Sequence, residues 1–298
     1  MGKASRSKQR LTAREKIAIQ RAAERRQQVR TRVSLTIGSV VIVIGIVVAF
    51  VVVKATSGSS PASSSGSVPT GAKASAIVSK VTNVPTSTLA AVGKGTMQTP
   101  PSALTNQPAL TQNGKPEIVY VGAEYCPFCA SERWAISVAL SRFGTFSNLG
   151  LTHSDPKDVF PNTNTLTFYK SSYTSKYLVF SPVEEADVHK KPLQTPTAQQ
   201  KALVAKYDAP PYVPSSSNQA IPFIDIGNKF LISGASYGPQ VLKGKTWDQI
   251  ATALADPSSP IAKAVLGTAN VVTADICKLT GNQPANVCTT PPVTSLNK

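Results

Sequence analysis

The chain has 298 residues, of which 41% are hydrophobic, 15% are charged and four are cysteines, and its formal net charge is +16. A chain of this length forms one or two domains, but much of the first third lacks a core-forming pattern, so we predict a single folded domain. More than half of the net charge lies in residues 1–32, which contain no recognisable base-reading module, so we do not expect a nucleic-acid-binding protein.

The first 53 residues combine a basic leader with a long uncharged run. Residues 1–32 carry eleven Lys or Arg and two acidic residues, a local charge of +9, and residues 33–53 contain no charge. A helix of about 20 apolar residues crosses a bilayer, and flanking positive charge stays on the cytoplasmic side. We therefore predict a cytoplasmic leader and one transmembrane helix, with the rest of the chain outside the cytoplasm. The alternative is a cleaved signal peptide, whose apolar stretch usually runs for only about 7 to 15 residues.

Residues 54–72 are mostly Ser, Gly, Ala and Pro without apolar periodicity, which predicts a flexible tether. The folded domain is expected to begin near Lys73 and to include residues 73–298. Short helices are predicted at residues 74–81 and 86–92, before the main core.

A Cys-Pro-Phe-Cys motif at residues 126–129 lies where two predicted elements meet. Residues 117–121 are β-branched and apolar, as in a buried strand, and residues 127–143 place large apolar side chains at helical spacing. The motif is therefore expected at a turn from a strand into a helix.

Pro127 favours the first helical position, which puts Cys126 at the N-cap of the predicted helix. The backbone amides and the helix dipole favour an anionic sulfur there, and such sites lower a thiol pKa from about 8.5 to roughly 3.5 to 7.5. We predict that Cys126 is the nucleophile of a thiol-disulfide exchange and that Cys129 resolves the mixed disulfide.

Two other interpretations of the motif stay open. A zinc site uses the same spacing, but it usually needs a second close pair, and Cys277 and Cys288 are widely spaced. A purely structural disulfide between Cys126 and Cys129 would close a very short loop and recover little chain entropy. We expect no metal and no cofactor.

The rest of the chain alternates strands and helices, which predicts an α/β sheet with helices packed on its faces. Residues 166–171 and 176–181 read as a hairpin across a short polar turn, and residues 222–226 and 229–233 read as a hairpin across Gly227-Asn228. The remaining predicted elements are a strand at 149–153 and helices at 197–207, 246–254 and 261–266.

This order of elements resembles the thioredoxin-like fold, with the Cys pair at the start of the first long helix and Ile221-Pro222 just before a later strand. The motif is similar to the pairs of glutaredoxin-type and DsbA-type proteins. Residues 120–134 further resemble domain-of-unknown-function family 929, over roughly residues 73–288.

The thioredoxin-like resemblance implies a central mixed sheet flanked by helices. It also implies that the Ile221-Pro222 bond is cis and faces the dithiol, and that the backbone of Ile221 binds substrate. Pro222 follows Cys129 by 93 positions, more than the bare fold requires, so we expect a β-rich insertion that contains the 166–181 hairpin.

Four residues near the motif are candidates for supporting roles. Glu124 and Glu132 flank the dithiol, and a buried carboxylate there can act as a proton relay for the second cysteine, although acids so placed are more often solvated. Tyr125 and Phe128 can form an apolar rim that binds substrate peptides, although aromatic side chains beside a helix start more often simply pack.

Cys277 and Cys288 enclose a polar loop and would be oxidised outside the membrane, so we predict a structural disulfide between them. The alternative is a second redox pair that relays electrons.

Together these features predict a membrane-anchored, single-pass thiol-disulfide oxidoreductase whose domain forms, reduces or isomerises disulfides in exported proteins. It would require an unidentified membrane or secreted redox partner. The alternative is a binding or assembly module at the membrane surface whose dithiol is permanently oxidised.

Overall fold

The structure, a computed structural model, describes residues 67–296. The predicted basic leader, the predicted transmembrane helix and most of the predicted tether lie outside the described residues. Within residues 67–296, no helix combines the length and the hydropathy that crossing a membrane requires.

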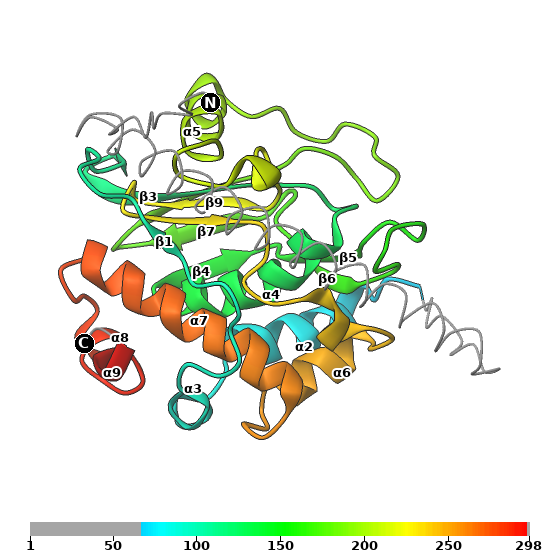
Figure 1. The fold of residues 1–298 in the computed structure, drawn as a ribbon. Coiled ribbons are helices and arrows are strands. Elements are labelled where there is room, and N and C mark those ends of the chain that lie inside the picture. Colours follow the sequence, from blue (N-terminus) through cyan, green and yellow to red (C-terminus); the bar gives the residue numbers. More distant parts are fainter. Residues whose placement is uncertain (1–66, 297–298) are drawn as a thin grey trace, which may run out of the picture. The chain divides into compact units, whose positions relative to one another are not determined.

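Helices and strands alternate along most of this part of the chain (Figure 1). The helices are α2 Gly71–Thr82, α3 Thr86–Val92, α4 Pro127–Ser141, α5 Ala198–Tyr207, α6 Trp247–Ala253, α7 Pro260–Leu279, α8 Ala285–Cys288 and α9 Val293–Leu296. The strands are β1 Ser102–Ala103, β2 Thr111–Gln112, β3 Lys115–Gly122, β4 Gly144–Ser147, β5 Gly150–His153, β6 Asn164–Thr167, β7 Ser172–Ser175, β8 Val179–Glu184, β9 Phe223–Ile226 and β10 Phe230–Ser233.

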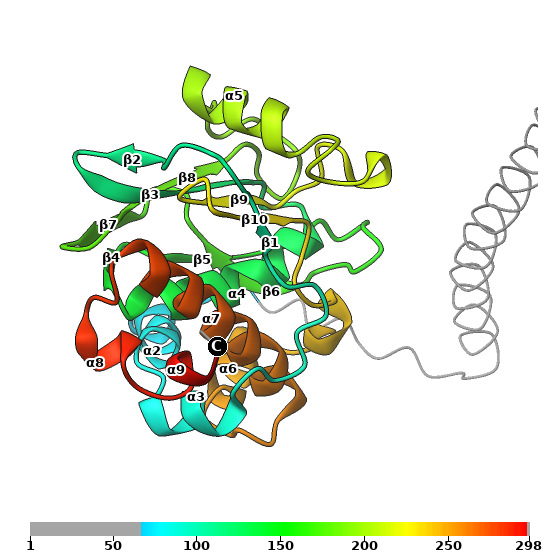
Figure 2. The ribbon, with the colours of Figure 1, turned by 60° about the vertical axis from the view of Figure 1, so that its left-hand side comes forward.

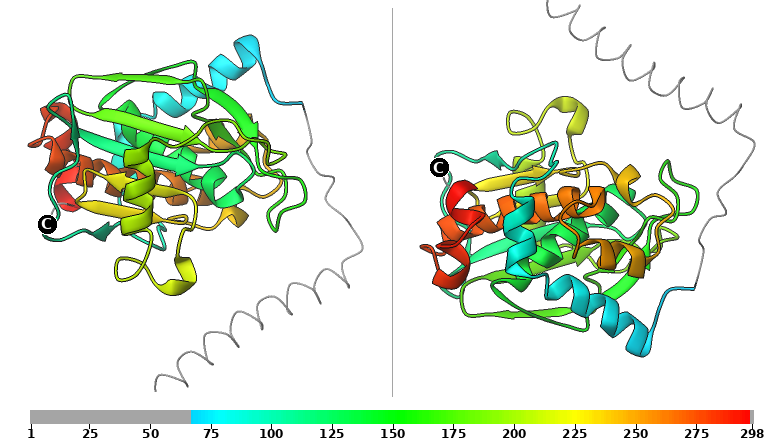
Figure 3. Two further views of the ribbon diagram at one scale, coloured as in Figure 1. Left: turned by 90° about the horizontal axis from the view of Figure 1, so that it is seen from above. Right: turned by 90° about the horizontal axis from the view of Figure 1, so that it is seen from below.

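Strand β3 is the centre of a mixed sheet. It runs parallel to β8 and antiparallel to β9, and β9 continues the sheet through β10 to the short β1. Helices α4 and α7 lie on one face of this sheet, and α5 lies on the other (Figures 1 and 2). The view from above shows α5 crossing the strands (Figure 3). The predicted α/β class, a mixed sheet flanked by helices, is confirmed.

The core has two parts, one on each face of the sheet. The larger part contains the buried residues of α4 and α7, including Trp134 and Leu140, packed against Tyr120 and Ile224 of the sheet. The smaller part lies under α5 and contains Leu203, Tyr207, Val119, Val121 and Phe223. Because β3 is buried on both faces, its side chains contribute to both parts, as expected for a run of consecutive apolar residues.

The predicted hairpin of residues 166–181 is wrong. Strand β6 pairs with β5, strand β7 pairs with β4, and β8 lies parallel to β3, with Glu117 opposite Val179. The polar residues 172–175 matched a hairpin turn signal, but that signal does not specify which strands pair. A parallel partner is joined through a crossover, so the partner of β8 lies on the far side of α4 in the sequence. Residues 179–184 therefore belong to the central sheet and not to an insertion.

Two predicted helix boundaries also need correction. Helix α2 begins at Gly71, so the last two residues of the predicted tether are helical. Helix α7 extends to Leu279 rather than ending near residue 266, and its buried polar residues explain the short prediction. Asn270 is a poor helix former, yet its side-chain amide donates to the carbonyls of Leu89 at 2.9 Å and Gly93 at 2.8 Å. This tertiary contact outweighs the unfavourable local propensity.

A candidate dithiol site at the start of α4

The Cys-Pro-Phe-Cys motif joins β3 to α4, as predicted. Cys126 is the N-cap of α4 in an extended conformation, and Pro127 occupies the first turn. The sulfur of Cys126 accepts a hydrogen bond from the backbone amide of Cys129, with Sγ and N 3.3 Å apart. The helix start therefore directs at least one amide donor toward Cys126, which is the arrangement that favours an anion.

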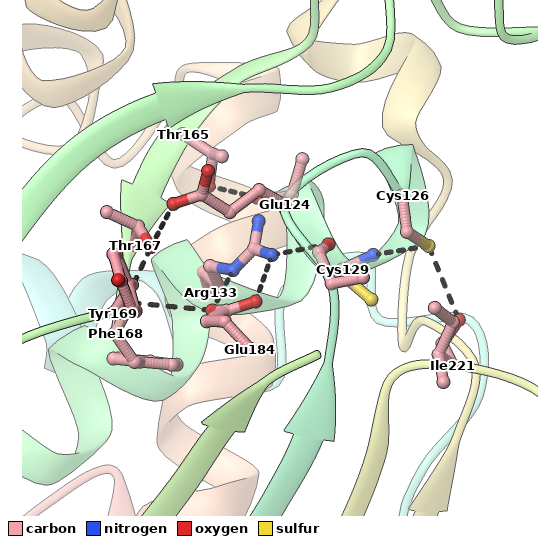
Figure 4. A network of polar contacts seen from close by, with 12 residues as sticks. Glu124, Cys126, Cys129, Arg133, Thr165, Thr167, Phe168, Tyr169, Glu184 and Ile221 are labelled. Atoms are coloured by element: carbon pink, nitrogen blue, oxygen red, sulfur yellow. Dashed lines mark hydrogen bonds and ion pairs between the residues drawn. The ribbon is translucent and has the colours of Figure 1, made fainter. Parts of the chain in front are cut away.

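The two cysteine residues differ in their exposed fractions. Cys126 retains 6% exposure, whereas Cys129 is completely buried, and both are free thiols. Cys126 also lies 3.6 Å from the carbonyl oxygen of Ile221, to which its thiol form can donate (Figure 4). The Ile221–Pro222 bond is cis, as predicted, and it precedes β9. The site thus combines residues of α4 with the segment before β9.

The environment separates the pKa values of the two thiols. A hydrogen bond from the Cys129 thiol, the Cys129 amide and the positive charge of Arg133 together lower the pKa of Cys126, although burial acts against them. Burial, followed by the hydrogen bond and the charge of Cys126, raises the pKa of Cys129 well above its ordinary value. When one of the two thiols ionises, the site therefore favours the negative charge on Cys126 and the proton on Cys129.

A buried ion pair lies beside the dithiol, and the sequence did not predict it. Arg133 of α4 donates from Nε and Nη2 to the two carboxylate oxygens of Glu184, each at 2.7 Å, and both side chains are fully buried. Nη2 also donates to the carbonyl of Ala123 at 2.6 Å. Burial acts to lower the pKa of Arg133, but Glu184 and other nearby acidic groups hold it well above its usual range. The arginine is therefore a permanent cation.

The two candidate proton relays lie in different surroundings. Glu132 is fully buried and accepts from the amide of Ser236 at 2.9 Å and from its hydroxyl at 3.0 Å. Burial raises the pKa of Glu132 to about 7. Glu124 accepts from the hydroxyl of Thr167 at 2.6 Å. Neither glutamate has a hydrogen bond to a cysteine in the described structure, and their role as relays stays a prediction.

The predicted aromatic rim is partly exposed and has a neighbour that the sequence did not indicate. Phe128 is 40% exposed and packs edge-on against Phe160, with ring centroids 6.0 Å apart. Tyr125 is half-buried, and its carbonyl accepts from the amide of Asp155 at 2.9 Å. The loop between β5 and β6 therefore lies against the site, and its Val159 is 76% exposed.

Cys277 and Cys288 form a disulfide, as predicted, with their Cα atoms 5.5 Å apart. The bond joins α7 to α8, and both cysteines are buried. Within residues 67–296, no cluster of three His, Cys, Asp or Glu side chains is arranged to hold a metal ion.

Comparison with protein families gives one match. A family model described as "Domain of unknown function (DUF929)" matches residues 102–278, which include the dithiol, the ion pair and the cis bond. Comparisons with curated proteins and with solved structures found no match.

Proposed function

Because the chain belongs to the DUF929 family, whose description gives no activity, we propose from the site itself that this protein is an extracytoplasmic thiol-disulfide oxidoreductase. The carrying observation is the difference between the two sulfurs. Cys126, at a helix N-cap, retains 6% exposure, whereas Cys129 beside it is fully buried. Reactive cysteines occupy partly exposed, electropositive surroundings, and resolving cysteines lie behind them.

The topology supports a thioredoxin-like fold for the domain. Strand β3, helix α4 and the parallel strand β8 are followed by α5, the antiparallel strands β9 and β10, and α7. In such folds the dithiol opens the first helix and a cis proline faces it. Here the carbonyl that precedes Pro222 lies 3.6 Å from the Cys126 sulfur.

The proposed chemistry is a reversible exchange of two electrons. The Cys126 thiolate attacks a substrate disulfide, forming a mixed disulfide and releasing one substrate sulfur as a thiolate that takes up a proton. Cys129 then loses its proton and attacks the Cys126 sulfur, which forms the Cys126–Cys129 bond and releases the second substrate sulfur. In the opposite direction, a substrate thiolate attacks the oxidised pair.

The surroundings of the dithiol suit a polypeptide substrate. We assign peptide binding to the backbone of Ile221 and to the apolar rim of Tyr125 and Phe128, which Phe160 and Val159 extend. The charge pattern of residues 1–53 supports a single-pass membrane anchor with the domain outside, so the substrates would be exported proteins. A membrane or secreted redox partner would restore the starting state of the pair.

Trapping of the mixed disulfide tests the exchange. We expect Cys129→Ser in the full-length chain to accumulate a mixed disulfide with a peptide that contains a disulfide, because Cys126 attacks that bond and no resolving thiol remains. Cys126→Ser should form none, and Cys277→Ala/Cys288→Ala should behave as wild type. Thiol mass-tagging across a glutathione redox series should show that only the Cys126–Cys129 pair titrates.

Two results would contradict the proposal. The first is a Cys126–Cys129 pair that stays oxidised under strong reductant, which would favour the binding or assembly module instead. The second is full exchange activity in Cys126→Ser.

A further inference from the structure

The buried pair Arg133–Glu184 carries an inference that rests on the proposed function. We propose that Arg133, partly neutralised by Glu184, is a positioning residue that stabilises the reduced dithiol, so that the domain preferentially donates its disulfide to exported thiols. In this direction the domain oxidises its substrates, which are unfolded or newly exported proteins with reduced cysteines.

The geometry holds a fixed cation behind the dithiol. Arg133 follows Cys129 by four positions on α4, so both side chains lie on the same face of the helix. The guanidinium donates three hydrogen bonds, two to the carboxylate oxygens of Glu184 at 2.7 Å each and one to the Ala123 carbonyl at 2.6 Å. Ala123 is part of the turn that leads from β3 to the dithiol, so the guanidinium is tied directly to the backbone of the site.

Glu184 does not satisfy the whole guanidinium. Within residues 67–296, Nη1 of Arg133 is buried and has no hydrogen-bond partner. The hydroxyl of Tyr120, which is also buried, likewise has none. Unpaired buried polar groups of this kind are unfavourable, so the presence of two of them in the same region of the core requires an explanation.

Stability alone does not explain the ion pair. Replacing a buried ion pair by apolar residues of similar volume is often neutral or stabilising, because desolvation of two charges offsets their attraction. Large fully buried side chains such as Phe168 and Trp134 belong to the same core, together with buried polar residues such as Thr167. A role that needs charge at this place is therefore the better explanation.

The charge affects the two redox states differently. A disulfide is neutral, whereas the reduced pair carries a thiolate on Cys126, so a nearby cation stabilises only the reduced form. Stabilising the reduced form makes the pair a stronger oxidant. The other ionisable groups near the dithiol are Tyr120 on β3, Glu124 and Tyr125 in the following turn, Asp158 in the loop between β5 and β6, Glu184 at the end of β8, Glu185 after it, and Lys190, whose Nζ lies 5.3 Å from the centroid of the Tyr125 ring. Arg133 is the fully buried cation of this set, whereas Lys190 is exposed.

In the favoured direction the reaction balances without another reagent. One substrate thiolate attacks the Cys126 sulfur, the Cys126–Cys129 bond breaks, and Cys129 takes up a proton. The second substrate thiolate then attacks its partner sulfur in the mixed disulfide, and Cys126 leaves as the stabilised thiolate. Two electrons pass from the substrate dithiol to the protein, and the substrate gains one disulfide.

The test compares variants of the full-length chain in detergent for their equilibrium with a glutathione redox buffer and for the pKa of Cys126, measured by thiolate absorbance. Arg133→Met/Glu184→Met removes both charges and keeps the volume. We expect its reduced form to lose at least tenfold in equilibrium stability, about 30 mV, and the pKa of Cys126 to rise. Glu184→Gln removes only the counter-charge, so both quantities should move in the opposite direction.

Asp225→Asn is the matched control, because Asp225 is a buried carboxylate of β9 whose oxygen accepts from the Asn228 amide in the turn after that strand. Asp225→Asn should leave the equilibrium constant with glutathione within twofold of wild type and the pKa of Cys126 unchanged. The inference is overturned if the folded charge variants keep the wild-type values. It is also overturned if Arg133→Met/Glu184→Met and Glu184→Gln shift the redox equilibrium in the same direction, or if Asp225→Asn shifts it as far as they do. These outcomes leave the exchange itself intact, whereas a wild-type protein that exchanges no disulfide would overturn the proposed function instead.

Discussion

Glu132 and Arg133 are neighbours on α4, and both are fully buried, but they have different electrostatic partners. Glu132 binds Ser236 in the segment after β10, whereas Arg133 binds Glu184 at the end of β8. Adjacent helix positions differ by about 100° around the axis, so one helix can place two charged residues in separate regions of the core. Only Arg133 has an ionised partner, and we therefore expect the two residues to respond differently to pH.

Replacing Glu132 should make the protein less sensitive to alkaline pH. The folded-state pKa of Glu132 is about 7, raised by burial from an ordinary value of 4.5. The folded state therefore holds the proton more tightly, and the stability that this contributes is fully present below pH about 4.5 and is lost as pH rises through 7. In Glu132→Gln the amide keeps the partners on Ser236 and does not titrate. We expect the variant to gain at most about 2.5 kcal/mol over wild type between pH 5 and pH 8, since each pKa unit corresponds to about 1.36 kcal/mol.

Urea unfolding at both pH values measures this gain as the difference between variant and wild type, which removes the titration of other groups. A difference that does not change with pH would show that Glu132 is ionised in the folded state. The same variant tests the proton relay, because slower disulfide exchange with an unchanged reduction potential would assign Glu132 that role.

The cysteines of the site could be predicted from sequence, but their buried cation could not. Pro127 directly after Cys126 indicated the N-cap position, and the structure has it there. The local sequence does not indicate that Arg133 is buried, because charged residues are almost never fully buried without a partner and its partner Glu184 is 51 positions away. Local spacing carries no information on such a pair.

At the scale of elements, the predictions from sequence were accurate where local signals determine the structure. Two features follow from neighbouring residues: the Gly227-Asn228 turn between β9 and β10, and Thr197 as the N-cap of α5, where it forms a capping box with Gln200. The partner of β8 and the length of α7 depend on contacts across the fold, namely the pairing with β3 and the bonds of Asn270. Those contacts are set by tertiary packing, so the predictions failed there.

The Cys277–Cys288 disulfide fixes α8 against the end of α7, and removing it should destabilise the fold without changing the dithiol. The bond closes a loop with a sequence separation of 11. Chain-entropy estimates for a loop of this size give about 3 kcal/mol. We expect Cys277→Ala/Cys288→Ala to lose about this amount in urea unfolding under oxidising conditions.

The reduction potential of Cys126–Cys129 in this variant separates the two interpretations of the second pair. An unchanged potential and an unchanged rate of exchange are expected for a structural bond. A slower reoxidation of Cys126–Cys129 in the variant would instead indicate a relay of electrons between the pairs.

For the whole molecule, charge and chemistry are divided along the chain. Residues 1–32 supply +9 of the formal net charge of +16, and the candidate site begins almost a hundred residues later. If residues 33–53 cross a membrane, this division puts the basic segment against anionic lipid and the dithiol in a compartment where disulfides persist. The disulfide Cys277–Cys288 agrees with that compartment, since stable disulfides are rare in the cytosol.

The membrane anchor is the last prediction, and it belongs to residues outside the described structure. We expect the full-length chain to stay in the membrane fraction after alkaline carbonate extraction, with residues 67–296 open to protease added from outside. Arginine at residues 41, 44 and 47 should release the chain, because each charge at the centre of a spanning helix is unfavourable by about 2.5 to 3.5 kcal/mol. Leucine at the same three positions is the control and should keep the chain in the membrane. Release of the wild-type chain by carbonate would contradict the predicted anchor. Protection of its domain from external protease would contradict the predicted topology and would place the dithiol in a reducing compartment, where donation of a disulfide is unfavourable.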